Sequence, residues 1–180
     1  MRIFTIGHST RTIDELCEIL STYQIVTLAD VRSFPRSYKN PQFNTDVISR
    51  ELMKHGIQYV WLEKLGGRRK GLGRASKNIC WKNRSFRNYA DYMETEQFTE
   101  GIGQLLQLGA SGRAAVMCAE SLYWRCHRSM IADLLKSKGV EVTHIFDGKH
   151  TQEHRYTECA RVVDGRLSYH ESTSSRVLSS

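Results

Sequence analysis

The sequence of 180 residues lacks a long apolar run. No stretch approaches the roughly 18 apolar residues that a membrane-spanning helix needs, so we expect no transmembrane segment and no membrane partner. The first ten residues, MRIFTIGHST, contain neither a long hydrophobic region nor a small-residue cleavage site, which argues against a secretory leader. We therefore expect a cytoplasmic protein.

A regular cysteine framework is also missing. The five cysteines are odd in number and irregularly spaced, and 40% hydrophobic residues suffice for a core without covalent links. We therefore expect free thiols rather than disulfides. Cys17 lies on an apolar helix face and is expected in the core, whereas Cys80 and Cys159 belong to no pattern.

No internal repeat is present, and the length suits one domain, which we assign to residues 1–172. The serine-rich residues 173–180 are expected to form a disordered tail.

Short apolar segments alternate with amphipathic ones. Strands are expected at residues 3–6, 25–29, 59–62, 114–117 and 140–146. Helices are expected after the capping pair Thr12 and Glu15, between Asn44 or Thr45 and Gly56, at 89–108 and at 129–138. This alternation predicts an α/β fold with a mainly parallel sheet flanked by helices in three layers. Asp164-Gly165 adds a small C-terminal hairpin.

Polar residues follow four of the expected strands. Because parallel strands end at one edge of a sheet, their loops should converge there into one site. The loops concerned are Gly7-His8-Ser9, Asp30-Val31-Arg32, Leu65-Gly66-Gly67 and Cys118 to Arg128. We expect one cavity to be lined by His8, Asp30, Arg32, Glu120 and Arg128.

Positive charge indicates the partner. The net charge is +7, and residues 66–87 contain no Asp or Glu while Trp81 and Phe86 stand among their basic residues. Arg32 and Arg36 flank Pro35, which stiffens their loop. We therefore expect a phosphate-bearing ligand, a nucleotide or nucleic acid. The residues expected to bind it are Ser9, Arg32, Arg36, Gly66, Gly67, Arg68, Arg125, His127 and Arg128.

The segment CAESLYWRCHR, residues 118–128, holds most of the candidate chemistry. Cys118 ends a strand before a helix, where the helix dipole and nearby arginines would favour a thiolate, so it is either a nucleophile or part of the pocket wall. Glu120 and His8 are candidates for proton transfer, and Asp30 could orient His8 or Arg32.

Other interpretations of this segment remain open. Cys118, Cys126 and His127 could bind a metal together with Glu120 or His8, although their spacing matches no common zinc signature. Cys118 and Cys126 could form a redox pair, which is disfavoured because one ends a strand and the other begins a helix. Both cysteines and His127 could simply pack in the core. The sequence itself requires no cofactor.

Four motifs in order resemble a known family. IGHST, DVRSFPRSYKNPQFN, GIQYVWLEKLGGRR and MCAESLYWRCHRSMIADLL are similar to the bacterial and archaeal family catalogued as domain of unknown function 488, over nearly the whole chain. The resemblance implies a cytosolic α/β domain with a polar site and assigns no reaction. The cysteine loop is also similar in outline to those of rhodaneses and cysteine phosphatases. Against a phosphatase, six residues rather than five separate Cys118 from Arg125, and Glu120 adds a negative charge.

These observations favour an enzyme that acts on a phosphate-bearing substrate, because polar groups in four loops exceed what charge-based binding alone requires. Two alternatives are a non-catalytic nucleic-acid-binding module, in which residues 66–87 contact phosphates and Trp81 stacks on a base, and a rhodanese-like sulfur-transfer or redox protein. Oligomeric state is left open.

Overall fold

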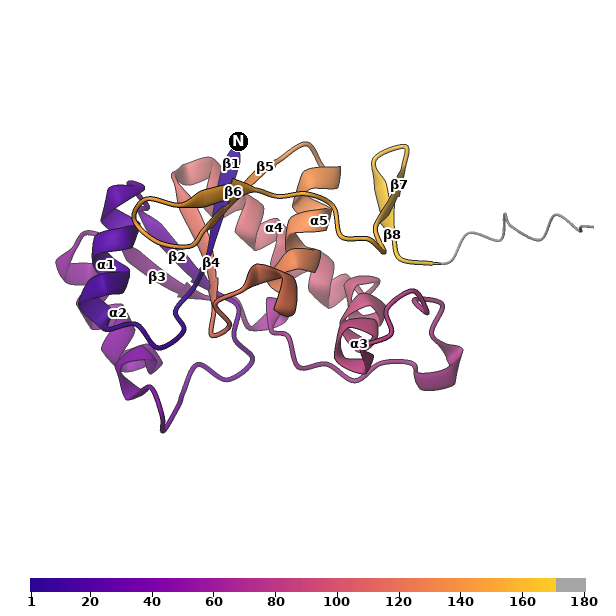
Figure 1. The fold of residues 1–180 in the computed structure, drawn as a ribbon, viewed down its shortest axis with the longest axis horizontal. Coiled ribbons are helices and arrows are strands. Elements are labelled where there is room, and N and C mark those ends of the chain that lie inside the picture. The colour runs from indigo at the N-terminus through magenta and orange to yellow at the C-terminus, as the bar shows by residue number, and fades with distance from the viewer. Residues whose placement is uncertain (171–180) are drawn as a thin grey trace, which may run out of the picture.

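A six-stranded mixed sheet with the order β3-β2-β4-β1-β5-β6 forms the centre of the computed structural model, which describes residues 1–170 (Figure 1). The strands of this sheet are β1 (Arg2–Gly7), β2 (Thr27–Asp30), β3 (Gln58–Trp61), β4 (Ala114–Cys118), β5 (Glu141–Ile145) and β6 (Thr151–Glu153). The first five strands are parallel, and β6 is antiparallel to β5. The expected three-layer α/β architecture is confirmed.

Helices cover both faces of the sheet (Figure 1). One face packs against α1 (Ile13–Thr22) and α2 (Thr45–Lys54), and the other packs against α3 (Arg84–Met93), α4 (Glu96–Ser111) and α5 (Arg128–Ser137). The central strands β1 and β4 are apolar along nearly their whole length because both of their faces are buried. Short 3₁₀ turns lie at Pro41–Phe43, Glu63–Leu65, Gly73–Ala75 and Tyr123–Arg125.

The strands β1 and β4 are parallel neighbours in the sheet, but the connections that leave them run toward opposite edges of the sheet. From β1 the chain passes through α1 to β2 on one side, whereas from β4 it passes through α5 to β5 on the other side. Loops that leave two adjacent parallel strands in opposite directions open a crevice at the carboxyl ends of those strands. The fold therefore provides a place for a ligand beside Cys118.

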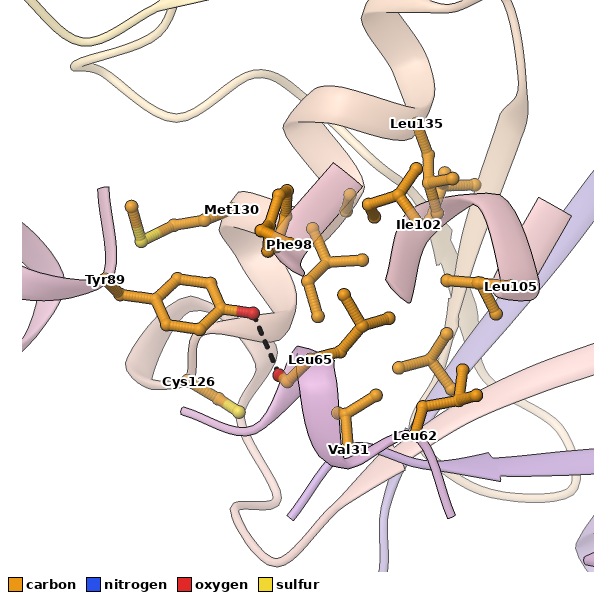
Figure 2. Close-up of a cluster of buried hydrophobic side chains, with 14 of the residues drawn as sticks. Val31, Leu62, Leu65, Tyr89, Phe98, Ile102, Leu105, Cys126, Met130 and Leu135 are labelled. Atoms are coloured by element: carbon orange, nitrogen blue, oxygen red, sulfur yellow. Dashed lines mark hydrogen bonds between the residues drawn. The ribbon is translucent and has the colours of Figure 1, made fainter. Parts of the chain in front are cut away.

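The larger apolar cluster lies between the sheet and α3, α4 and α5 (Figure 2). Tyr89 reaches into it from α3 and donates a hydrogen bond of 2.9 Å to the carbonyl oxygen of Leu65. Cys126 lies at the same end of the cluster as Tyr89 (Figure 2). This cluster therefore extends to the residues of the candidate site.

The local signals for helix ends and turns hold with few exceptions. Thr12 and Glu15 form the expected capping box, and Gly56 follows α2 with φ +70°. Asp164 and Gly165 have φ values of 49° and 72° and join β7 (Arg161–Val163) to β8 (Arg166–Ser168). The single helix expected at 89–108 is wrong. The chain breaks after Met93, and Thr95 caps a separate helix α4 by accepting a bond from the amide of Phe98.

The expectation that all cysteines are free is also wrong. Cys80 and Cys159 form a disulfide, with Cα atoms 5.7 Å apart and a separation of 79 positions in sequence. It links the basic segment 66–87 to the chain that leads into β7. Cys17, Cys118 and Cys126 are free and buried, as expected for Cys17.

None of the helices within residues 1–170 is long and apolar enough to cross a membrane. The tail expected at 173–180, and the last two residues of the expected domain 1–172, lie outside the described residues.

Candidate functional site

A cavity of about 530 Å³ opens at the carboxyl ends of β2, β3 and β4. Residues 32, 33, 34 and 36 line it after β2, residues 67 and 68 after β3, and residues 118–120 and 125–127 at and after the end of β4. Residues 83, 85, 86 and 89 at the start of α3 complete the wall. Four segments that are distant in sequence thus meet at the sheet edge.

Two cysteines form the floor of this cavity. The Sγ atoms of Cys118 and Cys126 are 2.7 Å apart, and the two residues are only 3% and 6% exposed. The turn Tyr123–Arg125 brings them together, because it folds the chain back and the amide of Cys126 donates to the carbonyl of Tyr123. The expectation that strand and helix would hold these sulfurs apart is therefore wrong.

His127 lies beside Cys126 in an orientation that suits proton transfer. Its Nε2 atom is 3.1 Å from the carbonyl oxygen of Val31, and its Nδ1 atom is 3.5 Å from Cys126 Sγ. A carbonyl oxygen only accepts, so Nε2 carries the hydrogen and Nδ1 presents a lone pair to the thiol. The thiol, the imidazole and an orienting carbonyl therefore form a nucleophile and base arrangement.

The two thiols differ in acidity. Burial on its own raises the pKa of Cys126, but the hydrogen bond from Cys118, the adjacent His127 ring and the charge of Arg128 bring it well below its usual value. Burial, together with the adjoining Cys126 sulfur, raises the pKa of Cys118 well above its usual value. Cys126 is therefore the more acidic thiol of the pair, and Cys118 is the one that keeps its hydrogen and can donate it to Cys126.

Arg128 supplies positive charge from beneath the cavity. It is 1% exposed, and its guanidinium donates to the carbonyl oxygens of Glu120 and Ser121. Its Nε atom has no partner among residues 1–170. Burial lowers the pKa of Arg128, but the Cys118 and Cys126 sulfurs raise it above its usual value, so this residue stays charged beside the thiols. It does not line the cavity itself.

Two glycines make the close packing around the thiols possible. At Gly7, at the end of β1, a Cβ atom would overlap the carbonyl oxygen of Glu120. At Gly67, a Cβ atom would come within 2.5 Å of Nδ1 of His127, which is the atom that faces Cys126. Glycine at these positions follows from close approach of neighbouring chain segments.

Asp30 and Arg32 form a buried ion pair at the end of β2. Asp30 is fully buried and accepts bonds from the backbone amide and the guanidinium of Arg32 and from the hydroxyl of Tyr59. The Arg32 Nη2 atom also donates to the carbonyl of Phe43 at 2.7 Å. Arg32 lines the cavity, but its charge is already balanced by Asp30, which lies behind the cavity wall.

His8 also lies behind the wall. Its Nδ1 donates to the carbonyl of Ser9 at 2.9 Å, its Nε2 lies 3.4 Å from Nη1 of Arg32, and its ring stacks on Phe43 at 4.1 Å. Burial lowers the pKa of His8 from 6.5 to about 4, so the ring is neutral at pH 7. Of the five residues expected in one cavity, the structure places Arg32 and Glu120 there and His8, Asp30 and Arg128 behind it.

Three guanidinium groups at the cavity are free to meet an anion. Arg36, Arg68 and Arg125 are exposed, and none of them lies within 4.0 Å of a carboxylate among residues 1–170. Glu120 is the carboxylate of this cavity, and its Oε1 accepts from the Ser121 hydroxyl and the Leu122 amide. Three positive groups therefore face one negative group.

The remaining expected ligands have structural roles. The amide of Ser9 donates to the carbonyl of Ala119, and Gly66 is buried beneath Ser33, so neither residue lines the cavity. Trp81 stacks on Phe86 and meets the edge of Tyr169, so it is packed rather than presented to a base.

Sequence reasoning missed how the basic segment is held. The half-exposed loop is tied to α3 by Asp91, which accepts bonds from the amide of Leu72 and the side chains of Ser76 and Asn78. Burial raises the pKa of Asp91, but these hydrogen bonds and nearby Arg87 lower it below its usual value, so the anchor is ionised. The available signal was Asp91 itself, an acidic residue directly before Tyr92 on an expected helix.

The metal alternative gains no geometric support. Within the described residues, no three His, Cys, Asp or Glu side chains are grouped as metal ligands, so Cys118, Cys126 and His127 with Glu120 or His8 are not proposed as a metal centre.

Comparisons with curated proteins and with solved structures found no match. A family model, described as Domain of unknown function DUF488, matches residues 12–135, which include all the cavity residues, from Arg32 to His127. The chain belongs to the DUF488 family.

Proposed function

We propose that this protein is an enzyme that binds a phosphate-bearing substrate in the cavity at the sheet edge and attacks it with the Cys126 thiolate. His127 receives the thiol proton, and Arg128 stabilises the thiolate from below. Arg36, Arg68 and Arg125 bind the phosphate. His8 and Asp30 position Arg32 and the floor of the cavity.

The observation that carries this proposal is the Cys126, His127 and Val31 arrangement. An imidazole held by a carbonyl through Nε2 directs its other nitrogen at the Cys126 sulfur, 3.5 Å away. A thiolate is the reactive form of cysteine, and an adjacent base with nearby positive charge is the usual means of producing it near neutral pH. This favours Cys126 over Cys118 as the nucleophile.

Phosphate as the bound group is supported by the unpaired arginines. A hydrogen bond to a charged group contributes about 1.5–3 kcal/mol, so each arginine that contacts the anion should matter about tenfold or more in affinity. The nucleic-acid-binding module has less support, because Trp81 is packed and Arg69 donates to the carbonyls of Gly66 and Glu63.

Alkylation tests the nucleophile. Iodoacetamide at pH 6.5 should label Cys126 ahead of Cys118 and Cys17, and peptide mapping by mass spectrometry identifies the labelled residue. His127→Gln should slow this labelling and shift its pH profile upward, because the proton acceptor is lost. Equal labelling of Cys126 in His127→Gln across the pH range would contradict the role of the imidazole.

Protection tests the phosphate site. Inorganic phosphate and adenosine monophosphate should slow alkylation of Cys126, and Arg68→Gln or Arg125→Gln should raise the concentration needed about tenfold. Arg50→Gln on α2 is the matched control, since it removes an exposed arginine from outside the cavity. Protection that is absent, or equally weakened by Arg50→Gln, would refute the phosphate site.

We also propose the cytoplasm as the location, because a reactive thiol pair needs a supply of reductant. The Cys80–Cys159 disulfide is uncommon there. The intact mass of protein isolated under thiol-blocking conditions shows whether this bond exists in the cell.

A further inference from the structure

We infer that the reacting group of the substrate is a disulfide, and that Cys118 is the resolving thiol that completes its reduction. This inference rests on the proposed function, since it uses the same Cys126 nucleophile and the same anion site.

The sulfur geometry is the first support. Cys118 Sγ and Cys126 Sγ are 2.7 Å apart, whereas a disulfide bond is about 2.05 Å long. A shift of about 0.7 Å would join them, so the cavity floor needs little rearrangement to hold either the dithiol or the disulfide. A nucleophile that reacted alone would not need a second thiol at this distance.

The chain around the pair supports the same conclusion. Cys118 ends β4, which is hydrogen-bonded on both sides by β1 and β2, and its position is therefore fixed. Cys126 lies between the turn Tyr123–Arg125 and the start of α5, outside both regular elements. Cys126 is thus the member of the pair that no strand pairing holds, and it is the one assigned to bond to substrate and then return to Cys118.

The loop is poorly suited to transfer of a phosphoryl group to sulfur. Such a site needs backbone amides directed at the anion, but the amides of Leu122, Arg125 and Cys126 bond to other groups in the loop. The exposed carboxylate of Glu120 is a further obstacle. Phosphate therefore serves to hold the substrate, and sulfur is the atom attacked.

The balanced reaction has two steps. The Cys126 thiolate attacks one sulfur of R–S–S–R, the Cys126–S bond forms, and R–S⁻ leaves with the electron pair of the broken bond. The departing thiolate accepts the proton of Cys118, whose sulfur then attacks Cys126 Sγ and releases the second R–S⁻. The substrate gains two electrons, and the protein dithiol becomes a disulfide. A small dithiol reductant regenerates the dithiol.

The rim of the cavity defines the class of substrate. Phe34 is 68% exposed, and the guanidinium of Arg68 lies over its ring at 5.6 Å. With Arg36 and Arg125 nearby, this rim suits a small disulfide that carries anionic groups and a flat ring. Large protein disulfides fit less well, because both sulfurs are nearly buried at the cavity floor.

The test uses 5,5′-dithiobis(2-nitrobenzoate), an anionic aromatic disulfide that releases a coloured thiolate. The full chain carries Cys17→Ala so that Cys118 and Cys126 are the free thiols within the described residues. This protein should release two equivalents of thiolate and end with a Cys118–Cys126 disulfide and no adduct. With Cys118→Ser, it should release one equivalent and retain a stable adduct on Cys126.

Each result separates the two proposals. If the protein with both thiols ends with two adducts and no disulfide, Cys118 is not a resolving thiol, although Cys126 remains the nucleophile. If neither thiol reacts while phosphate still protects Cys126 from alkylation, disulfide reduction is refuted and the anion site stands. If Cys126→Ser leaves the first release unchanged, the proposed nucleophile itself is wrong. Cys118→Ala, checked by circular dichroism, repeats the first comparison without a hydroxyl group.

Discussion

Replacing Asp30 by Asn tests whether this residue is a structural anchor or a catalytic group. Asp30 is fully buried and balances Arg32, whose guanidinium otherwise bonds to the carbonyl of Phe43 and, at 3.4 Å, to Nε2 of His8. The substitution removes the negative charge and directs amide hydrogens at the donors of Arg32 and Tyr59. Removing one partner of a buried ion pair costs about 3–5 kcal/mol. Because Arg32 borders the cavity and gains some solvent, we expect the lower limit, about 3 kcal/mol.

Urea unfolding at pH 7.5, followed by circular dichroism, measures this loss. Glu18→Gln is the matched control, since it removes an exposed carboxylate of α1 and should change stability by less than about 0.5 kcal/mol. A loss below about 1 kcal/mol for Asp30→Asn would refute the anchoring role. Unchanged stability together with slower alkylation of Cys126 would restore Asp30 as a participant in the chemistry.

Three further predictions follow from packing and burial. Gly7→Ala should destabilise the protein by about 3 kcal/mol or more because Cβ meets backbone of Glu120, whereas Gly103→Ala, in open space on α4, should stabilise it by about 0.5–1 kcal/mol in the same urea assay. The pKa of His8 falls from 6.5 to about 4 on folding, so the stability contributed by the neutral ring is complete above pH 6.5 and is lost as pH falls to 4. Between pH 4 and 6.5, His8→Gln should therefore reduce the slope of the unfolding free energy against pH by up to about 1.4 kcal/mol per unit. Burial raises the pKa of Cys17 to about 11, so peptide mapping should find it unlabelled by iodoacetamide at pH 8 in folded protein and labelled in urea.

Sequence patterns predicted most of the architecture because the relevant signals are local. The capping box at Thr12 and the hairpin at Asp164-Gly165 depend on neighbours within three residues, and both are present. The strand β6 was missed because its three residues, Thr151–Glu153, are exposed and carry no apolar pattern. The Cys80–Cys159 bond was missed because nothing local marks two residues that are 79 positions apart.

Prediction of the candidate site from the sequence was limited in the same way. Strand ends located Cys118, Glu120 and Arg32 at one edge, since parallel strands share that edge whatever the loops do. Whether Cys126 meets Cys118 depends on one 3₁₀ turn, and whether His8 faces a cavity or Phe43 depends on packing between distant segments. These outcomes are set by tertiary contacts, for which the sequence carries no short-range signal.

The Cys80–Cys159 bond affects the unfolded chain as well as the folded one. It closes a loop between cysteines 79 positions apart, and this loop contains β4, the turn Tyr123–Arg125 and both cavity thiols. In the chain-entropy description, closing a loop of this length lowers the entropy of the unfolded chain, which stabilises the folded state by about 4.5 kcal/mol at 25 °C. A reductant added to recycle Cys118 and Cys126 would also open this loop if it reaches it, and would lower the melting temperature without altering a contact in the cavity. Thiol turnover and thermal stability are therefore linked through the reductant concentration, and heat inactivation measured at different reductant levels reports on chain entropy as well as on chemistry.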